Sequence, residues 1–449
     1  MFTDDDPDSS WVVAAGIEDP EEDDNYPVVR FIKNDGSTMS DVFPVPIGEV
    51  LDERECSFPR VDCTYLDDGC RKVEVDVVYR YANNDYNWRD IENEWDIQVI
   101  QMIFKYNLND DWELMSSAYL YDYHMSRPLT GQTTPDIAIN QKNGDIYCAW
   151  SDLSEEICFV FYKRYDGNSW SLSPYQLQSN YRRHSPWFLS LDVGLVSGLP
   201  GTMAPVRVVG FAYTGGFTQL WDPDPEGPRD DLWGFRPIVG WWVTGFGEDT
   251  NHNAQYILVN PDFDPEEPEE PEEEWGNKYE AGMIRVDIPG DDAAGHGAAA
   301  VFMQDTCDEY YGDYEAYGIE SLTCDFTWLS DPGLELFERA VFPSLAIHDK
   351  DGTMASVTYL AREDEQDNWA AWATLWDLSS NSVAEPTIIS YGAQGSWSLS
   401  LEEILFHDWG SGSSLAVAGA NDEYWAAWSD KYGEDEPIRI LGHMGYADD

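Results

Sequence analysis

The alternation of apolar and polar residues repeats in two distant stretches of this chain. Residues 137–152 read IAINQKNGDIYCAWSD and residues 415–430 read LAVAGANDEYWAAWSD, with the same length and no gap between them. In each stretch, a short run of period two leads to a polar turn and then to a second run of the same period. This pattern predicts two antiparallel strands joined by a tight turn, which is a β-hairpin.

A third stretch has the same form. Residues 345–359 read LAIHDKDGTMASVTY. The pairs Asn143-Gly144 and Asp351-Gly352 supply the turn residues that tolerate a positive φ. Further pairs of apolar runs fill most of the chain, and almost none of them has the period of a helix. We count seven or eight such units of roughly 40–60 residues, a length typical of the blades of a propeller.

The sequence therefore predicts an all-β protein that forms a single β-propeller. We expect seven blades, with eight as the alternative. A blade is a small twisted sheet that cannot bury both of its faces alone, so the N- and C-terminal strands should meet and close the ring. The propeller is expected to cover residues 9–449, after an acidic N-terminal tail at residues 1–8.

One unit resembles the blades of the sialidase-like, BNR-repeat β-propellers. The segment TPDIAINQKNGDIYCAWSD, followed by FVFYKRYDGNSWS, has the rhythm of strands and turns found in that family. Residues 166–170, DGNSW, are similar to the Asp-box of the family but lack its leading Ser and one spacer. The resemblance implies the propeller fold. It does not extend to sialidase activity, because FRPI at residues 235–238 reverses the last two letters of the Phe-Arg-Ile-Pro motif.

Two inserts interrupt the strand pattern. Residues 50–70 contain Cys56, Cys63 and Cys70, and we expect an irregular insert stapled by disulfides. Residues 260–276 are rich in Pro and Glu and predict an extended, solvated loop.

Other cysteines suggest further bridges. Cys307 and Cys324 bracket an acidic loop and could join its ends, and Cys148 and Cys158 should lie on neighbouring strands of one hairpin. The alternative for this last pair is two small apolar side chains in the core.

The net charge of −61 excludes some partners. Nucleic acids and anionic membranes need a basic face on the protein, so neither is expected. The acidity indicates either solubility in salt or Ca²⁺ held in loops. No apolar run is long enough to span a membrane. We expect an extracellular or cell-surface protein with a glycan or a protein as its partner.

Basic residues are scarce, yet several precede an expected first strand of a blade. Loops that lead into the innermost strands surround the central channel, so these cations should form a funnel for an anionic ligand such as a uronic or sulfated sugar. The alternative is structural, since an Arg at a blade junction can pair with an acid of the next blade. The candidate ligand-binding residues are Arg127, Arg183, Arg236, Arg339 and Trp409.

Three histidines in the same class of loop are candidate catalytic bases, namely His184, His296 and His407. A lyase would use such a base to remove a proton beside a carboxylate. Two interpretations remain open from the sequence. The first is a binding or scaffold module for a glycan or a protein, and the alternative is a propeller enzyme, a lyase or a sialidase-like hydrolase, that acts on anionic polysaccharide. A subunit of an assembly with stacking faces is a third option.

Overall fold

A computed structural model gives the fold of the chain. It describes residues 11–18, 26–33, 38–46, 56–66, 71–82, 95–107, 111–120, 131–153, 158–171, 175–178, 189–196, 206–218, 233–243, 257–258, 281–288, 298–305, 314–320, 326–328, 340–347, 353–361, 370–389, 416–420, 423–430 and 439–446. All of the elements in these ranges are β-strands, so the all-β prediction is confirmed. The search of the described residues found no helix that could span a membrane.

The strands of the described residues form seven small antiparallel sheets, which we number along the chain. The first sheet contains β1 (Trp11–Glu18), β2 (Tyr26–Lys33) and β3 (Phe43–Pro44). The second contains β4 (Cys56–Tyr65), β5 (Lys72–Ala82), β6 (Trp95–Tyr106) and β7 (Trp112–Tyr119). The third contains β8 (Gly131–Ile139), β9 (Ile146–Leu153), β10 (Cys158–Tyr165) and β11 (Tyr175–Gln178).

The remaining four sheets follow the same plan. The fourth contains β12 (Leu189–Val196), β13 (Val206–Thr218), β14 (Trp233–Val243) and β15 (Ile257–Leu258). The fifth contains β16 (Ala281–Asp287), β17 (Ala299–Asp305), β18 (Tyr314–Glu320) and β19 (Phe326–Trp328). The sixth contains β20 (Ala340–Ile347), β21 (Met354–Ala361), β22 (Ala370–Asp377), β23 (Ser382–Val383) and β24 (Thr387–Ile388). The seventh contains β25 (Ala416–Ala420), β26 (Glu423–Asp430) and β27 (Arg439–Tyr446).

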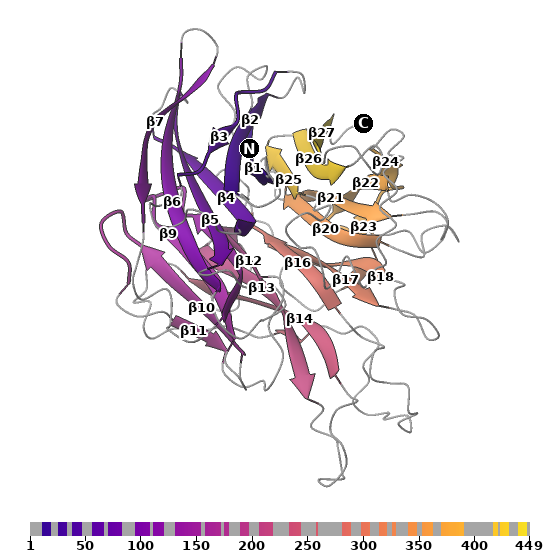
Figure 1. Cartoon of the computed structure of the whole chain (residues 1–449). Helices are drawn as coiled ribbons and strands as arrows, with labels where there is room; N and C mark the ends of the chain where they lie inside the picture. The colour runs from indigo at the N-terminus through magenta and orange to yellow at the C-terminus, as the bar shows by residue number, and fades with distance from the viewer. Residues whose placement is uncertain are drawn as a thin grey trace, which may run out of the picture.

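In each sheet the initial strands form a meander in which successive strands pair, with the first strand at one edge; in the sixth sheet β24 pairs with β22. The first strands of successive sheets contact one another in order, from β1 through β4, β8, β12, β16 and β20 to β25. Figure 1 shows the sheets following one another around these strands, from indigo to yellow. The three repeated sequence stretches are the hairpins β8–β9, β20–β21 and β25–β26, so each copy supplies the first two strands of a sheet.

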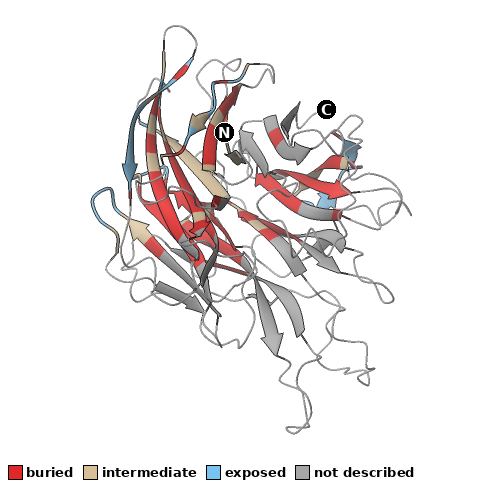
Figure 2. Ribbon diagram, in the orientation of Figure 1, coloured by how far each residue is buried: buried red, intermediate tan, exposed pale blue. Residues whose placement is uncertain are grey.

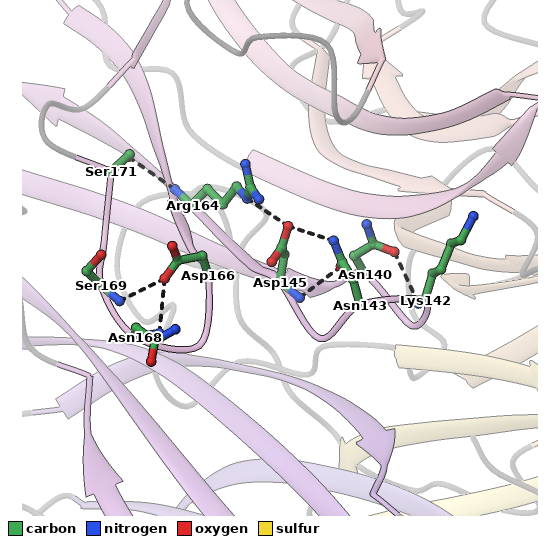
Figure 3. Close-up of polar contacts among 9 residues, drawn as sticks. All are labelled: Asn140, Lys142, Asn143, Asp145, Arg164, Asp166, Asn168, Ser169 and Ser171. Carbon is green, nitrogen blue, oxygen red and sulfur yellow. Dashed lines mark hydrogen bonds and ion pairs between the residues drawn. The ribbon is translucent and has the colours of Figure 1, made fainter.

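The turn between β8 and β9 is built from its own polar side chains (Figure 3). Gly144 has a φ of 72°, as the Asn-Gly pair predicted. Asp145 accepts hydrogen bonds from Asn143 Nδ2 at 2.8 Å and pairs with Arg164 Nε of β10 at 2.7 Å. These contacts tie the turn to the third strand of the same sheet.

The Asp-box-like segment also forms a structural turn (Figure 3). The Asp166 carboxylate accepts the backbone N–H groups of Asn168 at 3.0 Å and Ser169 at 2.9 Å, and these bonds lower its pKa. Trp170 donates its indole N–H to the carbonyl of Leu120 at 2.6 Å, which joins the second and third sheets. The motif therefore fixes the packing of two sheets.

Buried residues lie along the strands of neighbouring sheets (Figure 2), and their apolar side chains form the core. The first and second sheets enclose one cluster, which includes Phe31 stacked on Trp112 with ring centroids 4.2 Å apart. Further clusters lie between the second and third sheets and between the third and fourth sheets. Burial thus depends on sheet-to-sheet contact, because no single sheet covers both of its faces.

The structure corrects three expectations from the sequence. Residues 56–65 lie within the expected irregular insert at 50–70, but they form the regular strand β4. Cys56, Cys63 and Cys148 form no disulfide. The expected Cys148–Cys158 bridge is wrong, because Cys148 pairs in register with Lys163. The tail at residues 1–8, the loop at 260–276, Cys70, Cys307 and Cys324 lie outside the described residues.

The first and seventh sheets also touch. Trp425 of β26 packs against Val12 of β1 and Ile32 of β2 in a small buried cluster. Only 3% of Trp425 is exposed. In Figure 1 the yellow seventh sheet lies beside the indigo first sheet. Residues at the two ends of the chain thereby share one patch of core.

We predict that Trp425→Ala lowers the free energy of unfolding by about 3–5 kcal/mol, because it leaves a cavity between the first and last sheets. The measurement is chemical denaturation of the full chain. Tyr119→Ala is the control, since 43% of Tyr119 is exposed on β7. Equal, small losses in both variants would contradict the packing of the two end sheets.

Candidate functional site

The first strand of each sheet has one edge without a partner strand, and this edge faces the neighbouring first strands. Backbone N–H groups on such an edge need a hydrogen-bond acceptor once water is excluded. Carboxylates from the preceding sheet supply it. Asp62 of β4 accepts the N–H of Ile139 in β8 at 2.6 Å, and Asp136 of β8 accepts the N–H of Leu191 in β12 at 2.7 Å.

The same bond recurs between the later sheets. Asp192 of β12 accepts the N–H of Ile288, and Asp287 accepts the N–H of Ile347 in β20. Four carboxylates thus join five consecutive first strands. We call these four bonds the edge bonds, and their acceptors are Asp62, Asp136, Asp192 and Asp287.

A second layer of polar side chains lies two residues earlier on two of these strands. The sequence Arg-Val-Asp occurs at residues 60–62 in β4 and again at residues 285–287 in β16. Residues at i and i+2 of a strand share a face and lie about 7 Å apart. Arg60 and Arg285 therefore accompany Asp62 and Asp287 on the faces that carry the edge bonds.

The charge of Arg60 acts on Arg285. The pKa of Arg285 is lowered to about 9, first by burial and then by the positive charge of Arg60, against the opposing effect of Asp136. Their strands belong to the second and fifth sheets, so this coupling brings together residues distant in the chain. In the described part of the chain, neither guanidinium has an ion pair within 4.0 Å, and each donates only to the carbonyl before it, Pro59 and Ile284.

Asp136 lies within reach of both positive charges but is occupied by backbone. Its carboxylate accepts the N–H of Ile137 at 3.0 Å and that of Leu191. Burial raises its pKa, although Arg60 and Arg285 lower it. In the described residues neither guanidinium forms an ion pair with Asp136, so both keep donors for an anion from outside.

Asp62, Asp192 and Asp287, which we call the carboxyl layer, are acidic groups with raised pKa values or with such a neighbour, in contrast to the two guanidinium groups. The pKa of Asp192 is well above its usual range, first because of burial and then because of the charge of Asp287, to which it is hydrogen-bonded. Burial raises the pKa of Asp62 to about 6. The Asp192–Asp287 pair therefore holds a proton to higher pH than an ordinary carboxyl group does. All three side chains remain half-buried, so solvent reaches them.

We call these residues the axial cluster, after their place on the converging first strands. It offers two positive groups without ion pairs in the described residues, an acid pair with a raised pKa at Asp192, and the carboxyl group of Asp62. Such a set can hold an anion, donate a proton and accept one. The members are Arg60, Asp62, Asp136, Asp192, Arg285 and Asp287.

The structure assigns one of the predicted site residues to an unexpected strand. Arg236 was expected before a first strand, but it lies within β14, the third strand of its sheet, opposite Gly215. The other candidates fall outside the described residues: Arg127, Arg183, Arg339, Trp409, His184, His296 and His407. His296 precedes β17, which is a second strand.

Sequence reasoning missed the axial cluster because it searched loops for scarce cations. The signal was the repeated Arg-Val-Asp, in which charges interrupt strands that are otherwise apolar. In the searched, described residues, no group of three or more His, Cys, Asp or Glu side chains could hold a metal ion.

No protein-family model matches the chain. No curated protein matches it either. Among solved structures, the chain is similar to a Hadza microbial sialidase, with 10% identity, a TM-score of 0.42 and coverage of 94% of this chain and 74% of that one. It is also similar to the polysaccharide lyase Uly1, with 9% identity, a TM-score of 0.43 and coverage of 98% and 88%. The phage phi92 endosialidase gives 9% identity, a TM-score of 0.40 and coverage of 97% and 65%. Similarities at this level assign no activity to the chain.

We predict that Asp136→Ala lowers the free energy of unfolding by about 3 kcal/mol. The substitution leaves the N–H of Leu191 without its acceptor and removes the negative charge beside two buried guanidinium groups. Thermal and chemical denaturation measure the loss. Asp41→Ala, at an exposed position, should change stability by less than about 0.5 kcal/mol. Equal effects would show that the edge bond contributes nothing.

Proposed function

We propose that the chain is a secreted or surface-exposed β-propeller of seven blades that binds an anionic glycan at its axis and hydrolyses it. The single observation that carries this proposal is the axial cluster, in which Arg60 is close enough to lower the pKa of Arg285 and Asp192 has a raised pKa beside Asp287. Of the two functions that the sequence leaves open, these residues favour a propeller enzyme over a binding module.

The propeller architecture is supported by the order of the sheets. Their first strands contact one another in sequence, and Trp425 joins the last sheet to Val12 in the first. The coupling of Arg60 with Arg285 supports a common axis, because β4 and β16 are separated along the chain by two whole sheets. The seven sheets are then the seven blades, closed between the first and the last.

An anionic ligand is supported by the two guanidinium groups. Guanidinium forks suit carboxylate and sulfate groups, which they bind through two parallel hydrogen bonds. A uronic or sulfated sugar would neutralise two like charges that now repel each other. Its hydroxyl groups and its glycosidic oxygen would then lie toward the carboxyl layer, about 7 Å further along the strands. This extends the predicted cationic funnel to residues inside the strands.

The carboxyl layer has the groups that glycoside hydrolysis requires. The proton of the Asp192–Asp287 pair passes to the glycosidic oxygen as its bond to the anomeric carbon breaks. The Asp62 carboxylate takes a proton from the water that forms the new bond at this carbon. The pair is left without its proton and Asp62 is protonated, and exchange with solvent restores both. Residues Arg127, Arg183, Arg339 and Trp409 remain proposed contacts for more distant sugar units.

We predict a bell-shaped dependence of kcat/KM on pH. Activity should fall below a pH of about 6, because the Asp62 carboxylate becomes protonated there. It should fall again at alkaline pH, when the Asp192–Asp287 pair loses its proton. The assay measures new reducing ends on polyuronate, sulfated and sialylated glycans. A rate that is constant through pH 6 would exclude Asp62 as the base.

We also predict that the carboxyl layer mainly determines kcat and that the guanidinium groups mainly determine KM. Asp192→Asn keeps an acceptor for the Ile288 N–H but removes the proton, so kcat should fall about 10²- to 10³-fold with little change in KM. Arg285→Gln should raise KM at least about tenfold, because it removes a charged contact with the ligand. Arg71→Gln, at an exposed position, is the matched control.

Three other outcomes contradict parts of this proposal. Unsaturated uronates among the products would establish a lyase and exclude hydrolysis. Binding without turnover, lost in Arg285→Gln, would refute the catalytic step and return the chain to the class of glycan-binding modules. Neither binding nor turnover on any anionic glycan would refute the proposal as a whole.

A further inference from the structure

The tip of the hairpin β8–β9 carries a reactive pair of residues that the proposed activity does not use. Asn143-Gly144 is the one Asn-Gly pair in the sequence, and the Asn143 side chain is exposed. Both polar atoms of its amide group contact Asp145 (Figure 3). An asparagine before a glycine is chemically labile, because glycine has no side chain to keep its backbone nitrogen away from the neighbouring amide carbon.

Deamidation at this pair proceeds through a succinimide ring. The Gly144 nitrogen forms a bond to Cγ of Asn143, and the bond from Cγ to Nδ2 breaks. Nδ2 leaves as ammonia with the proton that the Gly144 nitrogen gives up. Water then opens the ring, adding its hydroxyl group to a ring carbonyl carbon and its other hydrogen to the nitrogen. Opening at Cγ gives aspartate, and opening at the backbone carbonyl gives isoaspartate, in which the main chain runs through the side chain.

Hydrogen bonds of the folded turn oppose the first step. The Gly144 N–H donates to the Asn140 carbonyl at 2.8 Å, which engages the proton that must be given up. Asn143 Nδ2 donates to Asp145 Oδ2 at 2.8 Å, and Oδ1 of the same amide accepts the Asp145 N–H at 3.1 Å. These two bonds fix the orientation of the amide group, so it is not free to rotate onto the Gly144 nitrogen. Ring closure therefore requires the tip to open locally.

Three contacts hold the tip closed, and they join it to other strands. Asp145, which is 5% exposed, pairs with Arg164 Nε of β10 at 2.7 Å. Gln141 Nε2 donates to the carbonyl of Cys63 in β4 at 2.9 Å. The edge bond of Ile139 to β4 lies two residues before Gln141. The tip thus belongs to the junction between the second and third sheets.

We propose that Asn143 is a site of spontaneous deamidation, and that its conversion to aspartate or isoaspartate loosens the junction between the second and third sheets. The new carboxylate has no hydrogen to donate to Asp145, and its charge repels the Asp145 carboxylate at hydrogen-bonding distance. It also competes with Asp145 for Arg164, which ties the tip to β10. Isoaspartate, in addition, lengthens the main chain inside a tight turn. The proposal is independent of the proposed activity.

The first test is storage of the full folded chain in mildly alkaline buffer, with deamidation at each asparagine followed by peptide mapping and mass spectrometry. Asn143 should convert before Asn168 and Asn381, which each precede a serine in other loops of the described chain. Asp145→Ala should speed the conversion about tenfold, because the amide group loses a hydrogen bond to a charged partner. Conversion no faster than at Asn168 and Asn381, or a rate that a folded Asp145→Ala leaves unchanged or lowers, would overturn the proposal.

The second test needs no variant of Asp145. It uses Asn143→Asp as the product, with Asn168→Asp as the matched control, since Asn168 is exposed and only its backbone N–H bonds to Asp166. Asn143→Asp should make the amide of Ile139 exchange about tenfold faster, because the junction opens more often once a charged hydrogen bond is lost. Asn168→Asp adds the same charge and should keep the wild-type rate. An unchanged rate at Ile139 in Asn143→Asp, or an equal increase in both variants, would contradict the effect on the junction.

Discussion

The edge bonds are the interaction on which the rest of this structure depends. A small sheet with a free edge and two uncovered faces is not stable alone, and this chain contains seven of them in its described part. Apolar packing covers the faces. The carboxylates of Asp62, Asp136, Asp192 and Asp287 satisfy the edges, each by accepting an N–H group of the next first strand. Without them, buried backbone donors would remain unpaired where the sheets converge.

The edge bonds place carboxyl groups where the sheets converge, and the proposed chemistry depends on these groups. Carboxyl groups that lose part of their hydration and lie close to one another resist ionisation, which is why the pKa of Asp192 beside Asp287 is raised. Two guanidinium groups on the same converging strands have no ion pair in the described residues. The same residues can therefore serve the fold through their backbone bonds and a ligand through their remaining polar atoms.

Much of the fold could be predicted from the sequence, because it depends on local patterns. The period-two runs identified the hairpins β8–β9, β20–β21 and β25–β26, and an Asn-Gly or Asp-Gly pair marked the first two turns, since alternation and turn chemistry are properties of neighbouring residues. Cys148 was misassigned because register decides which residues face each other, and register is not readable from spacing alone. The blade number and the closure of the ring remain predictions.

The axial cluster could not be predicted, because it depends on which strands converge. Arg60 and Arg285 are 225 positions apart, and only the order of the sheets brings their charges together. Arg236 illustrates the same limit, since a strand that looks like the first of a blade is the third. The repeated Arg-Val-Asp indicates the axial cluster only once both copies are known to lie on first strands.

Amide hydrogen exchange tests the central claim most directly. If the edge bonds exist, the amides of Ile139, Leu191, Ile288 and Ile347 should exchange as slowly as amides paired within the sheets. Their strands lie at sheet edges, so no neighbouring strand could protect these positions. Rapid exchange at all four amides in the folded chain would contradict the account and leave the convergence of the first strands without its physical cause.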